Sequence, residues 1–391
     1  MKIILVHNSY QQPGGEDVIF EQERKMLEDA GHRVVAYCRS NWDAEAYPGI
    51  RRLSLAKRTI WASDTRRHFV RLLQQEKPDL VHVHNTFVMI SPSVYSACYQ
   101  AKIPVVQTLH NYRLLCPAAT FFRDGQVCEE CLSTLWKGVE HACYRHSYSA
   151  TAVVALMLAS HRLRDTWKRE VACFVALSQF ARNKFVQGGL PEEKIFVKPN
   201  FVSPDPGART GDGDHVVFVG RLSPKKRVDT ILAAWKRLSE SIPLVIIGGG
   251  PDLEALQAEA AQLGLSQVRF KGQLPRDQTL TEINKARLLV FASEWYENFP
   301  VTLAEAFACS TPVICSRLGV MEEIVADGQT GIHFSPGDPE DLARKVEWAW
   351  THPQEMRAMG VTARKEYEAK YTAEKNYPIL MNIYQRALQT S

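Results

Sequence analysis

Short apolar runs rich in β-branched residues alternate with helix-length segments along almost the whole chain. The runs are apolar at successive positions rather than at every second one, which is typical of parallel strands that are buried on both faces. In the first half, strands are predicted at 2–7, 33–38, 80–84, 105–110, 173–177 and 195–198. In the second half, they are predicted at 216–220, 244–248, 268–272, 288–292, 313–316 and 331–334. The pattern predicts an α/β protein with two successive β/α arrays.

A segment rich in proline and glycine separates the two arrays, at residues 198–207 and 211–214. The length of 391 residues also fits two domains of ordinary size. We therefore expect an N-terminal domain at 1–199, a C-terminal domain at 200–371, and a final helix at 372–391 that returns to the first domain. In such sheets, ligands bind beyond the carboxyl ends of the strands.

Charge is distributed unevenly between the two halves. Residues 1–200 carry 26 Lys and Arg against 19 Asp and Glu, a net charge of +7, whereas residues 201–391 carry 21 against 24, a net charge of −3. The excess of positive charge favours an anionic partner for the first half, such as a membrane surface, a nucleic acid or a phosphorylated substrate. The longest nearly uncharged apolar stretch, 150–160, is about half of the roughly 20 residues that span a bilayer, and no signal-peptide pattern follows Met1. We expect a cytoplasmic protein.

Two carboxylates follow the predicted strand 288–292: Glu297 in a loop, and Glu305 in the second turn of a helix that begins near Pro300. Carboxylates at this end of a strand are suited to hydrogen bonds with sugar hydroxyls, and the N–H groups at the helix start are suited to an anion. Their spacing alone fits two solvated charges at a helix end equally well.

Two cations follow the predicted strand 216–220: Arg221 comes directly after Gly220, and Lys226 lies just before a helix. Arg is suited to forked contacts with phosphate oxygens, and Lys adds a point charge. A further turn, Gly248-Gly249-Gly250, would let a phosphate or nucleoside approach the backbone, although tight turns also need glycine. Taken alone, the cations fit a basic surface loop.

Three of the histidines on predicted strands of the first half are candidates for a functional role. His82 and His84 alternate with apolar residues, and we expect one to face a helix layer and the other to lie near the ligand side. A structural role is favoured for each of them. His110 ends its strand beside Asn111 and is the favoured functional histidine.

Four of the nine cysteines are close in sequence, with eleven, two and eleven residues between successive members: Cys116, Cys128, Cys131 and Cys143. The central pair, Cys128 and Cys131, has the two-residue spacing that is typical of zinc ligands. Four thiolates could therefore hold a structural zinc ion in an inserted segment at 112–147. The alternatives are four reduced thiols or a disulfide formed on oxidation. We do not expect catalysis to depend directly on this cluster.

Two basic segments, 51–61 and 66–71, combine seven cations with apolar residues against one acid, Asp64. They predict either an amphipathic helix resting on anionic lipid or a solvated helix face. The stretch 152–159 is predicted to form a buried helix, and residues 161–164 to extend the basic surface.

Taken together, these motifs resemble glycosyltransferase family 4, the retaining nucleotide-sugar transferases of the GT-B fold. The resemblance rests on Gly220-Arg221-Leu222 with Lys226, on Gly248-Gly249-Gly250-Pro251, and on the frame from Glu297 to Glu305. The segments Gly14-Gly15-Glu16 and Thr108-Leu109-His110-Asn111 fit the acceptor-side half. The resemblance implies two Rossmann-like domains that face each other across a cleft, the first binding the acceptor and the second the nucleotide sugar.

The resemblance also implies a role for each matching residue. Arg221 and Lys226 would bind the donor diphosphate and stabilise the charge that develops on it. Glu305 would hold the ribose hydroxyls, Glu297 would contact hydroxyls of the transferred sugar, and His110 would face that sugar as it reacts. The remaining donor-binding positions are Gly15, Gly220, Gly249, Gly250, Asn298, Phe299 and Pro300.

The chain departs from the family pattern at two positions. Arg227 stands where glycine usually follows the phosphate-binding lysine, and it would either contact phosphate or point to solvent. Asn298 stands where glycine usually follows the first glutamate, so its backbone must adopt the turn without glycine, which Asn tolerates better than most residues.

The implied activity is retaining transfer of a sugar from a nucleoside-diphosphate sugar to a glycan or lipid-linked acceptor, in polysaccharide or lipopolysaccharide biosynthesis. It would occur in the cytoplasm, with an anionic membrane surface as a candidate partner and no nucleic acid. No metal would be required for catalysis, because Arg221 and Lys226 take the place of a divalent ion. The alternatives are another GT-B enzyme, such as a nucleotide-sugar epimerase or a phosphorylase, and a non-catalytic nucleotide-sugar or membrane-binding module.

Two other enzyme classes are disfavoured. A glycosidase would use the two carboxylates as acid and base, but the cations and glycine turns indicate a diphosphate leaving group, which needs neutralising rather than protonating. A dinucleotide oxidoreductase is disfavoured because no Gly-x-Gly-x-x-Gly motif follows the first strand.

Overall fold

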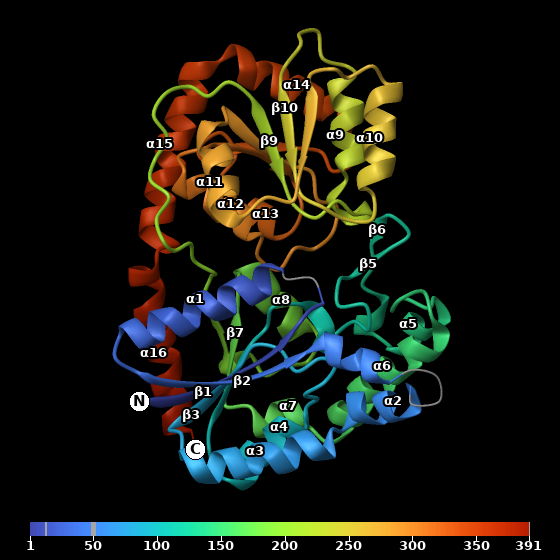
Figure 1. The fold of residues 1–391 in the computed structure, drawn as a ribbon, viewed down its shortest axis with the longest axis vertical. Helices are drawn as coiled ribbons and strands as arrows, with labels where there is room; N and C mark the ends of the chain where they lie inside the picture. Colours follow the sequence, from blue (N-terminus) through green and yellow to red (C-terminus); the bar gives the residue numbers. More distant parts are fainter. Residues whose placement is uncertain (12–13, 48–51, 391) are drawn as a thin grey trace. The chain divides into compact units, whose positions relative to one another are not determined.

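The computed structural model describes residues 1–11, 14–47 and 52–390. The chain forms two compact units, each built around a six-stranded parallel sheet (Figure 1). The first unit consists of Met1–Phe121, Cys128–Asn200 and Asn376–Ser391, and the second of Phe122–Val127 and Phe201–Lys375. Residues 122–127 thus group with the second unit, whereas the sequence placed the whole insertion 112–147 in the first domain.

The sheet of the first unit has the order β2-β1-β3-β4-β7-β8, with every pair parallel. Its strands are β1 (Lys2–Ser9), β2 (Arg33–Ser40), β3 (Leu80–Val83), β4 (Val105–Thr108), β7 (Cys173–Ala176) and β8 (Ile195–Val197). The strand order reverses between β1 and β3. In doubly wound sheets, ligands bind beside such a switch point.

Helices cover both faces of this sheet. Figure 1 shows α1 on one face and α3 and α4 on the other. The α-helices are α1 (Gly15–Asp29), α2 (Arg52–Ile60), α3 (Ser63–Glu76), α4 (Ser93–Gln100), α5 (Trp136–Glu140), α6 (Tyr148–Leu163), α7 (Thr166–Glu170) and α8 (Gln179–Gln187). Shorter elements are η1 (Asn41–Ala46), η3 (Tyr112–Leu114), η4 (Glu130–Leu132), η5 (Glu192–Lys194) and the hairpin β5 (Phe122–Arg123) and β6 (Gln126–Val127).

The second sheet has the order β11-β10-β9-β12-β13-β14 and is also parallel throughout. Its strands are β9 (Val216–Val219), β10 (Leu244–Ile247), β11 (Val268–Gly272), β12 (Leu288–Phe291), β13 (Val313–Ser316) and β14 (Gly331–Phe334). This is the strand order of a dinucleotide-binding Rossmann sheet, with its switch point between β9 and β12.

The second sheet is enclosed by helices. In Figure 1, α9 and α10 lie on one face, and α11 and α12 on the other. The helices are η6 (Pro224–Lys226), α9 (Val228–Trp235), α10 (Leu253–Gln262), α11 (Arg276–Lys285), α12 (Val301–Ala308), α13 (Val320–Ile324), α14 (Pro339–Thr351) and α15 (Pro353–Lys370). Apolar side chains of β9, β10 and β12 are buried with Trp235 and Leu342 in one continuous core, which fixes the strand ends that carry the site.

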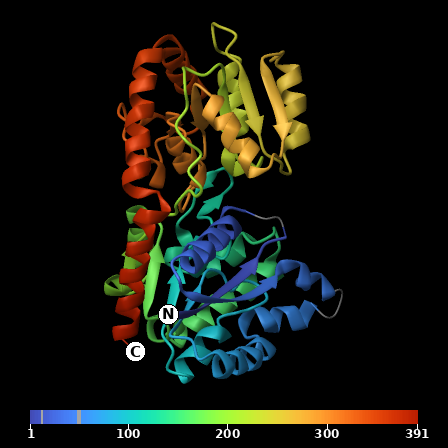
Figure 2. The ribbon, with the colours of Figure 1, turned by 60° about the vertical axis from the view of Figure 1, so that its left-hand side comes forward.

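Helix α16 (Ala373–Gln389) lies beside the first sheet for most of its length (Figure 2). Asn376 Nδ2 donates a hydrogen bond to the Pro199 carbonyl at 2.7 Å, and Tyr384 Oη lies 2.7 Å from His82 Nδ1. The end of the chain therefore belongs to the first unit, although α15 before it belongs to the second.

The predicted fold class is confirmed, because all twelve predicted strands are present and each ends within two residues of its expected bounds. Smaller predictions are wrong. The stretch 152–159 lies within α6 but buries only one side, since Leu156 is 57% exposed while Leu158 is fully buried. His161 does not extend a basic surface, because it is buried and its Nδ1 lies 2.9 Å from Thr166 Oγ1.

None of the helices in the described ranges combines the length and the apolar character that a membrane span requires.

Candidate active site

A polar site forms at the switch point of the second sheet. Strands β9 and β12 are neighbours there, and the loops that follow them leave the same edge of the sheet. Gly220 and the exposed Arg221 follow β9, and residues 292–300 follow β12. The sequence-predicted donor residues are thus carried by adjacent strand ends.

Lys226 and Glu297 form an ion pair at this edge. Lys226 Nζ lies 2.5 Å from Glu297 Oε1, and the two side chains are 17% and 8% exposed. The same carboxylate oxygen accepts hydrogen bonds from Ser293 Oγ at 2.6 Å and from Trp295 Nε1 at 2.8 Å. Three donors on one oxygen hold the carboxylate in a single orientation.

Glu305 lies in α12 and is buried, with Arg276 as its partner. Arg276 Nε donates a hydrogen bond to Glu305 Oε1 at 3.2 Å, and Arg276 Nη1 donates another to the Ser203 carbonyl at 3.0 Å. Burial raises the pKa of Glu305, although the charge of Arg276 opposes the rise. A carboxylate has about four acceptor positions, so this one can accept further hydrogen bonds from ligand hydroxyls.

Two carboxylates hold the side chain of Arg227, which is 27% exposed. Its Nη1 lies 3.0 Å from Glu294 Oε2, and its Nη2 lies 3.1 Å from Asp229 Oδ2. Its backbone has a φ of +51°, the left-handed conformation that glycine adopts most easily. This conformation explains why glycine is common at the position, and the two ion pairs hold the arginine that replaces it.

The glycine turn after β10 packs against the loop after β9. A Cβ added at Gly248 would lie 1.8 Å from the Gly220 carbonyl oxygen, and one at Gly250 would lie 2.1 Å from the Leu222 carbonyl oxygen. A Cβ at Gly249 would meet nothing closer than Gln273 Oε1 at 3.8 Å. Gly248 and Gly250 are therefore required for packing, and Gly249 alone leaves room beside the backbone.

Asn298, Phe299 and Pro300 lead into α12. Asn298 does not have a positive φ, so the prediction that it must adopt a glycine-like turn is wrong. Phe299 packs against Tyr371, with ring centroids 5.6 Å apart, and Pro300 directly precedes the helix.

In the first unit, Gly15 is the first residue of α1, the helix that follows β1 in the sequence. Asp17 lies within the first turn of this helix, where its Oδ2 accepts a hydrogen bond from the Gly14 N–H at 2.8 Å. Its Oδ1 lies 2.9 Å from His7 Nε2. Gly15 is exposed at this strand end.

Glu16 was named in the family resemblance but was given no role, and its surroundings are unusual. Tyr10 Oη donates a hydrogen bond to Glu16 Oε2 at 3.2 Å, and Asn111 Nδ2 donates another at 3.4 Å. Burial, followed by the charge of Asp17, raises the pKa of Glu16 to about 8. Glu16 therefore holds a proton at neutral pH, beside the residue that follows His110. Its position directly after the two glycines was the signal that could have indicated it.

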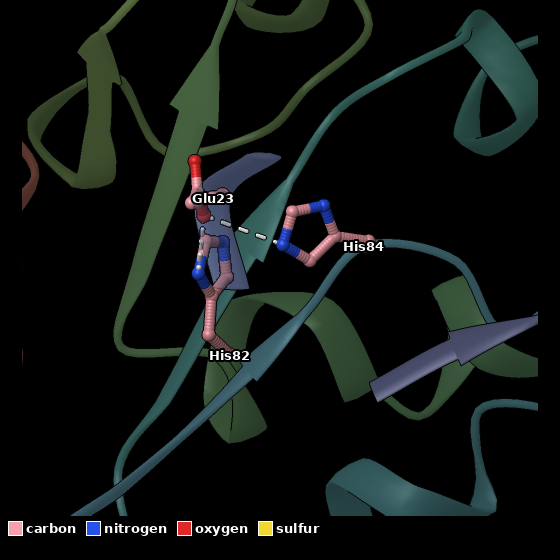
Figure 3. Close-up of side chains that lie close together, drawn as sticks. All are labelled: Glu23, His82 and His84. Atoms are coloured by element: carbon pink, nitrogen blue, oxygen red, sulfur yellow. Dashed lines mark ion pairs between the residues drawn. The ribbon is translucent and has the colours of Figure 1, made fainter. Parts of the chain in front are cut away.

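His82 and His84 both face Glu23 of α1 (Figure 3). His82 Nδ1 lies 3.0 Å and His84 Nε2 lies 3.3 Å from Glu23 Oε1, and all three side chains are buried. The expectation that only one of the two histidines faces a helix layer is wrong, because both contact Glu23 of α1. Sequence reasoning also missed Glu23, although it occupies a core position of α1 between Phe20 and Leu27.

His110 follows β4 and contacts His84. His110 Nε2 lies 2.9 Å from His84 Nδ1, and the rings are stacked with centroids 5.1 Å apart. Burial, reinforced by the neighbouring His84, lowers the pKa of His110 well below the usual value. The structure thus connects the favoured histidine to the two that were assigned structural roles.

Glu23, His82 and His84 make up the one group, within the described part of the chain, of three or more candidate metal ligands whose ligand atoms lie within 4.8 Å of one another. Lys198 Nζ lies 2.9 Å from Glu23 Oε2, and both ring nitrogens of His82 lie 2.7 Å from hydroxyl groups. The ammonium group of Lys198 already neutralises the carboxylate of Glu23. The cluster is therefore arranged for hydrogen bonding rather than for a metal ion.

None of the four clustered cysteines forms a disulfide bond. A hydrogen bond with Cys131 and backbone hydrogen bonds from Ala118, Thr120 and Phe121 lower the pKa of Cys116 to about 5, against the effect of its burial. The pKa of Cys131 is raised by its hydrogen bond to Cys116, by burial, and by the charges of Cys116, Cys143 and Cys128. The thiols share one neighbourhood, although no three of their sulfur atoms lie within 4.8 Å of one another.

The basic segments form α2 and α3, and two of their members are held inside the first unit. Arg58 Nη1 lies 2.6 Å from Asp64 Oδ2, and Trp61 stacks on His161 with ring centroids 6.1 Å apart. Arg51 lies outside the described residues.

A pocket of about 740 Å³ lies among η1, α2 and α6 of the first unit. Its lining combines apolar residues such as Leu53, Phe87 and Val154 with polar residues such as Asn41 and Arg145. Four segments far apart in the sequence supply this lining, so no local pattern indicated the pocket.

Two Rossmann-like sheets in one chain, with a cation–carboxylate pair at the switch point of the second, define a protein of the GT-B fold class. A family profile described as "Glycosyltransferase Family 4" matches residues 13–206, and one described as "Glycosyl transferases group 1" matches residues 204–366. The chain belongs to glycosyltransferase family 4.

Characterised relatives match parts of the chain. D-rhamnosyltransferase WbpZ of Pseudomonas aeruginosa is 31% identical over 159 residues, which cover 40% of this chain and 41% of that protein. The GDP-mannose-dependent alpha-(1-6)-phosphatidylinositol monomannoside mannosyltransferase of Mycolicibacterium smegmatis is 31% identical over 220 residues, 50% of this chain and 56% of that protein. The chain thus spans about half the length of these curated relatives.

Solved structures share the fold over the full chain. HepE of Anabaena, in complex with UDP-glucose, has a TM-score of 0.68 and 18% identity, covering 100% of this chain and 99% of that one.

Proposed function

We propose that the protein is a retaining glycosyltransferase that transfers a sugar from a nucleoside-diphosphate sugar to a glycan or lipid-linked acceptor in polysaccharide or lipopolysaccharide assembly. Family membership supports the sugar transfer. The observation that carries the donor assignment is the Lys226–Glu297 pair at the switch point of the second sheet.

In the proposed donor site, cations bind the diphosphate and carboxylates bind hydroxyl groups. Arg221 and Lys226 bind the diphosphate, and an arriving phosphate competes with Glu297 for the Lys226 ammonium group. Glu297 keeps its hydrogen bonds from Ser293 and Trp295, so it stays in place to contact hydroxyls of the sugar. Glu305, in α12, accepts hydrogen bonds from the ribose hydroxyls.

The chemistry requires the leaving diphosphate to be stabilised as its bond to the sugar breaks. Fixed cations supply this stabilisation, which is the largest kind of contribution in such sites. The acceptor oxygen attacks from the face that the diphosphate leaves, and a departing phosphate oxygen takes the acceptor's proton, so the anomeric configuration is retained. On this account the reaction needs no metal ion.

The acceptor is assigned to the first unit. The pocket of about 740 Å³ among η1, α2 and α6 is its proposed site, since it combines apolar surface with Asn41 and Arg145. The exposed cations of α2 and α3 are the proposed contact with an anionic membrane, where a lipid-linked acceptor would be found. The proposal places the reaction at the cytoplasmic face of that membrane.

We further propose that Cys116, Cys128, Cys131 and Cys143 hold a structural zinc ion. The lowered pKa of Cys116 supports this, because a cysteine that binds a metal does so as a thiolate. Backbone N–H groups that donate hydrogen bonds to the Cys116 sulfur favour the thiolate. Zinc would draw the four sulfur atoms together and order the segment between η3 and α6.

A thermal-shift screen of nucleoside diphosphates and their sugars tests the donor assignment. We expect one base to raise the melting temperature selectively, since a ligand that binds only the folded protein stabilises it. A selective shift without any turnover would favour a non-catalytic module. Turnover that returns an epimerised sugar, or that consumes inorganic phosphate, would favour an epimerase or a phosphorylase.

A further inference from the structure

A continuous set of hydrogen-bonding groups runs through the first unit from Lys198 to His110. Lys198 Nζ donates to Glu23 Oε2 at 2.9 Å and to Asn376 Oδ1 at 2.8 Å. The other Glu23 oxygen faces His84 Nε2 at 3.3 Å, as Figure 3 shows, and His84 Nδ1 lies 2.9 Å from His110 Nε2. Glu23 and His84 are almost completely shielded from solvent.

Glu23 is the group that sets the direction of these hydrogen bonds. Burial alone would raise its pKa, but the charges of Lys198 and His82 and the hydrogen bonds from His82 and His84 hold it well below the usual value. Glu23 is therefore an anion, and an ionised carboxylate can only accept hydrogen bonds. His84 Nε2 and Glu23 Oε1 lie at an ion-pair distance of 3.3 Å, and in the described residues neither atom has a hydrogen-bond partner of good geometry. A lone pair on Nε2 would repel the anionic oxygen that it faces, so Nε2 carries the proton.

The tautomer of His110 follows from that of His84. Burial and the nearby His82 lower the pKa of His84 to about 4, so the ring is neutral and its Nδ1 is an acceptor. His110 Nε2 must then donate to His84 Nδ1. Because the pKa of His110 is also lowered, this ring is neutral too, and its Nδ1 carries a lone pair.

We propose that Glu23 acts through His84 as a positioning pair that fixes His110 in its Nε2-protonated tautomer, so that Nδ1 accepts a hydrogen bond from a substrate hydroxyl. The part that concerns substrate rests on the proposed function. An accepting nitrogen selects a hydroxyl donor and disfavours a phosphate oxygen, which is itself an acceptor. Glu23 and His84 touch no substrate and act only through His110.

Nitrogen-15 NMR of the full-length protein with labelled histidine tests the tautomers directly at neutral pH. We expect His84 and His110 both to show a protonated Nε2 and an unprotonated Nδ1, with assignments taken from single histidine substitutions. A protonated Nδ1 on His110, or a doubly protonated ring, would overturn the proposal. This measurement needs no turnover, so it is independent of the proposed activity.

Glu23→Gln should reverse both tautomers. Lys198 keeps the amide oxygen of the new side chain, which turns the NH₂ group toward His84 Nε2 and makes that nitrogen an acceptor. The proton of His84 then resides on Nδ1, which donates a hydrogen bond to His110 Nε2. His110 Nε2 is therefore an acceptor, and the one proton of that neutral ring resides on Nδ1. Glu21→Gln removes an exposed charge from the same helix and serves as the control, with both tautomers unchanged.

Steady-state kinetics then separate this role from simple folding support. For Glu23→Gln we expect kcat to fall by on the order of tenfold with little change in the donor KM, consistent with loss of one hydrogen bond. An unchanged kcat alongside reversed tautomers would overturn the substrate part of the proposal. If the wild-type protein turns over no nucleoside-diphosphate sugar, the proposed function fails while the tautomer result stands by itself.

Discussion

Lys226 Nζ and Glu297 Oε1 lie 2.5 Å apart at the end of strands β9 and β12, in a pair that is largely shielded from solvent. The two residues are far apart in the sequence and meet because the strand order of the second sheet reverses between these strands. Truncating one partner of such a pair leaves the other with fewer contacts. Here Ser293 and Trp295 still hold Glu297 when the lysine is removed.

Lys226→Ala should therefore fold but lose donor binding. Charge-assisted contacts contribute about 1.5–3 kcal/mol each, so we expect the affinity for nucleoside diphosphate to fall by about tenfold to a hundredfold. Isothermal titration calorimetry measures this. Lys225→Ala is the matched control, because Lys225 Nζ lies over the Trp295 ring at 5.1 Å and was assigned no phosphate contact. Equal affinity in the two variants would refute the assignment of Lys226.

In the glycine turn after β10, one glycine is needed for packing and another leaves room for a ligand. Gly250→Ala forces a Cβ against the Leu222 carbonyl oxygen, and we expect a loss of about 2 kcal/mol or more in the free energy of unfolding. Gly249→Ala meets no such contact and should leave the melting temperature close to wild type, while weakening nucleoside-diphosphate binding if phosphate approaches this backbone. Denaturant unfolding of both variants, paired with titration of the second, checks the contrast.

Glu16 should make the stability of the protein depend on pH. Its pKa is raised from 4.5 to about 8, so between these values the folded protein keeps a proton that the unfolded chain has released. The unfolded state binds fewer protons in this window, and stability must decline as pH rises through it. Glu16→Gln should flatten the decline in melting temperature between about pH 5 and 8. An unaltered slope, relative to Glu21→Gln, would contradict the raised pKa.

Metal analysis of the purified protein tests the zinc proposal. We expect about one zinc ion per chain, lost in Cys116→Ser and retained in Cys38→Ser, which removes an exposed cysteine outside the cluster. Chelation should lower the melting temperature of the wild type, because a structural metal contributes folding free energy. A zinc content near zero would end the proposal.

The sheets were predictable because their strands are apolar at successive positions, and this pattern can be recognised in the sequence without knowing the tertiary contacts. Residues that follow strands, such as Gly220, Arg221 and Glu297, could be placed at the correct edge for the same reason. The topology of β9 and β12 then brought Lys226 and Glu297 together, which spacing alone did not specify.

Other features depended on contacts that no local pattern encodes. Glu23 is buried because Lys198 and two histidines surround it, and those partners lie more than fifty residues away in sequence. Arg227 has a positive φ, and Glu294 and Asp229 hold its side chain. The pocket in the first unit is likewise assembled from separate segments.

The most direct test of the central claim is sugar transfer by the wild-type protein and by Glu297→Gln. The donor chosen by thermal shift is incubated with lipid-linked and glycan acceptors, and release of nucleoside diphosphate is measured together with the anomeric configuration of the product by proton NMR. The account predicts transfer with retained configuration, and a rate that falls by on the order of a hundredfold in the variant. Equal rates in the two proteins, or an inverted product, would contradict it.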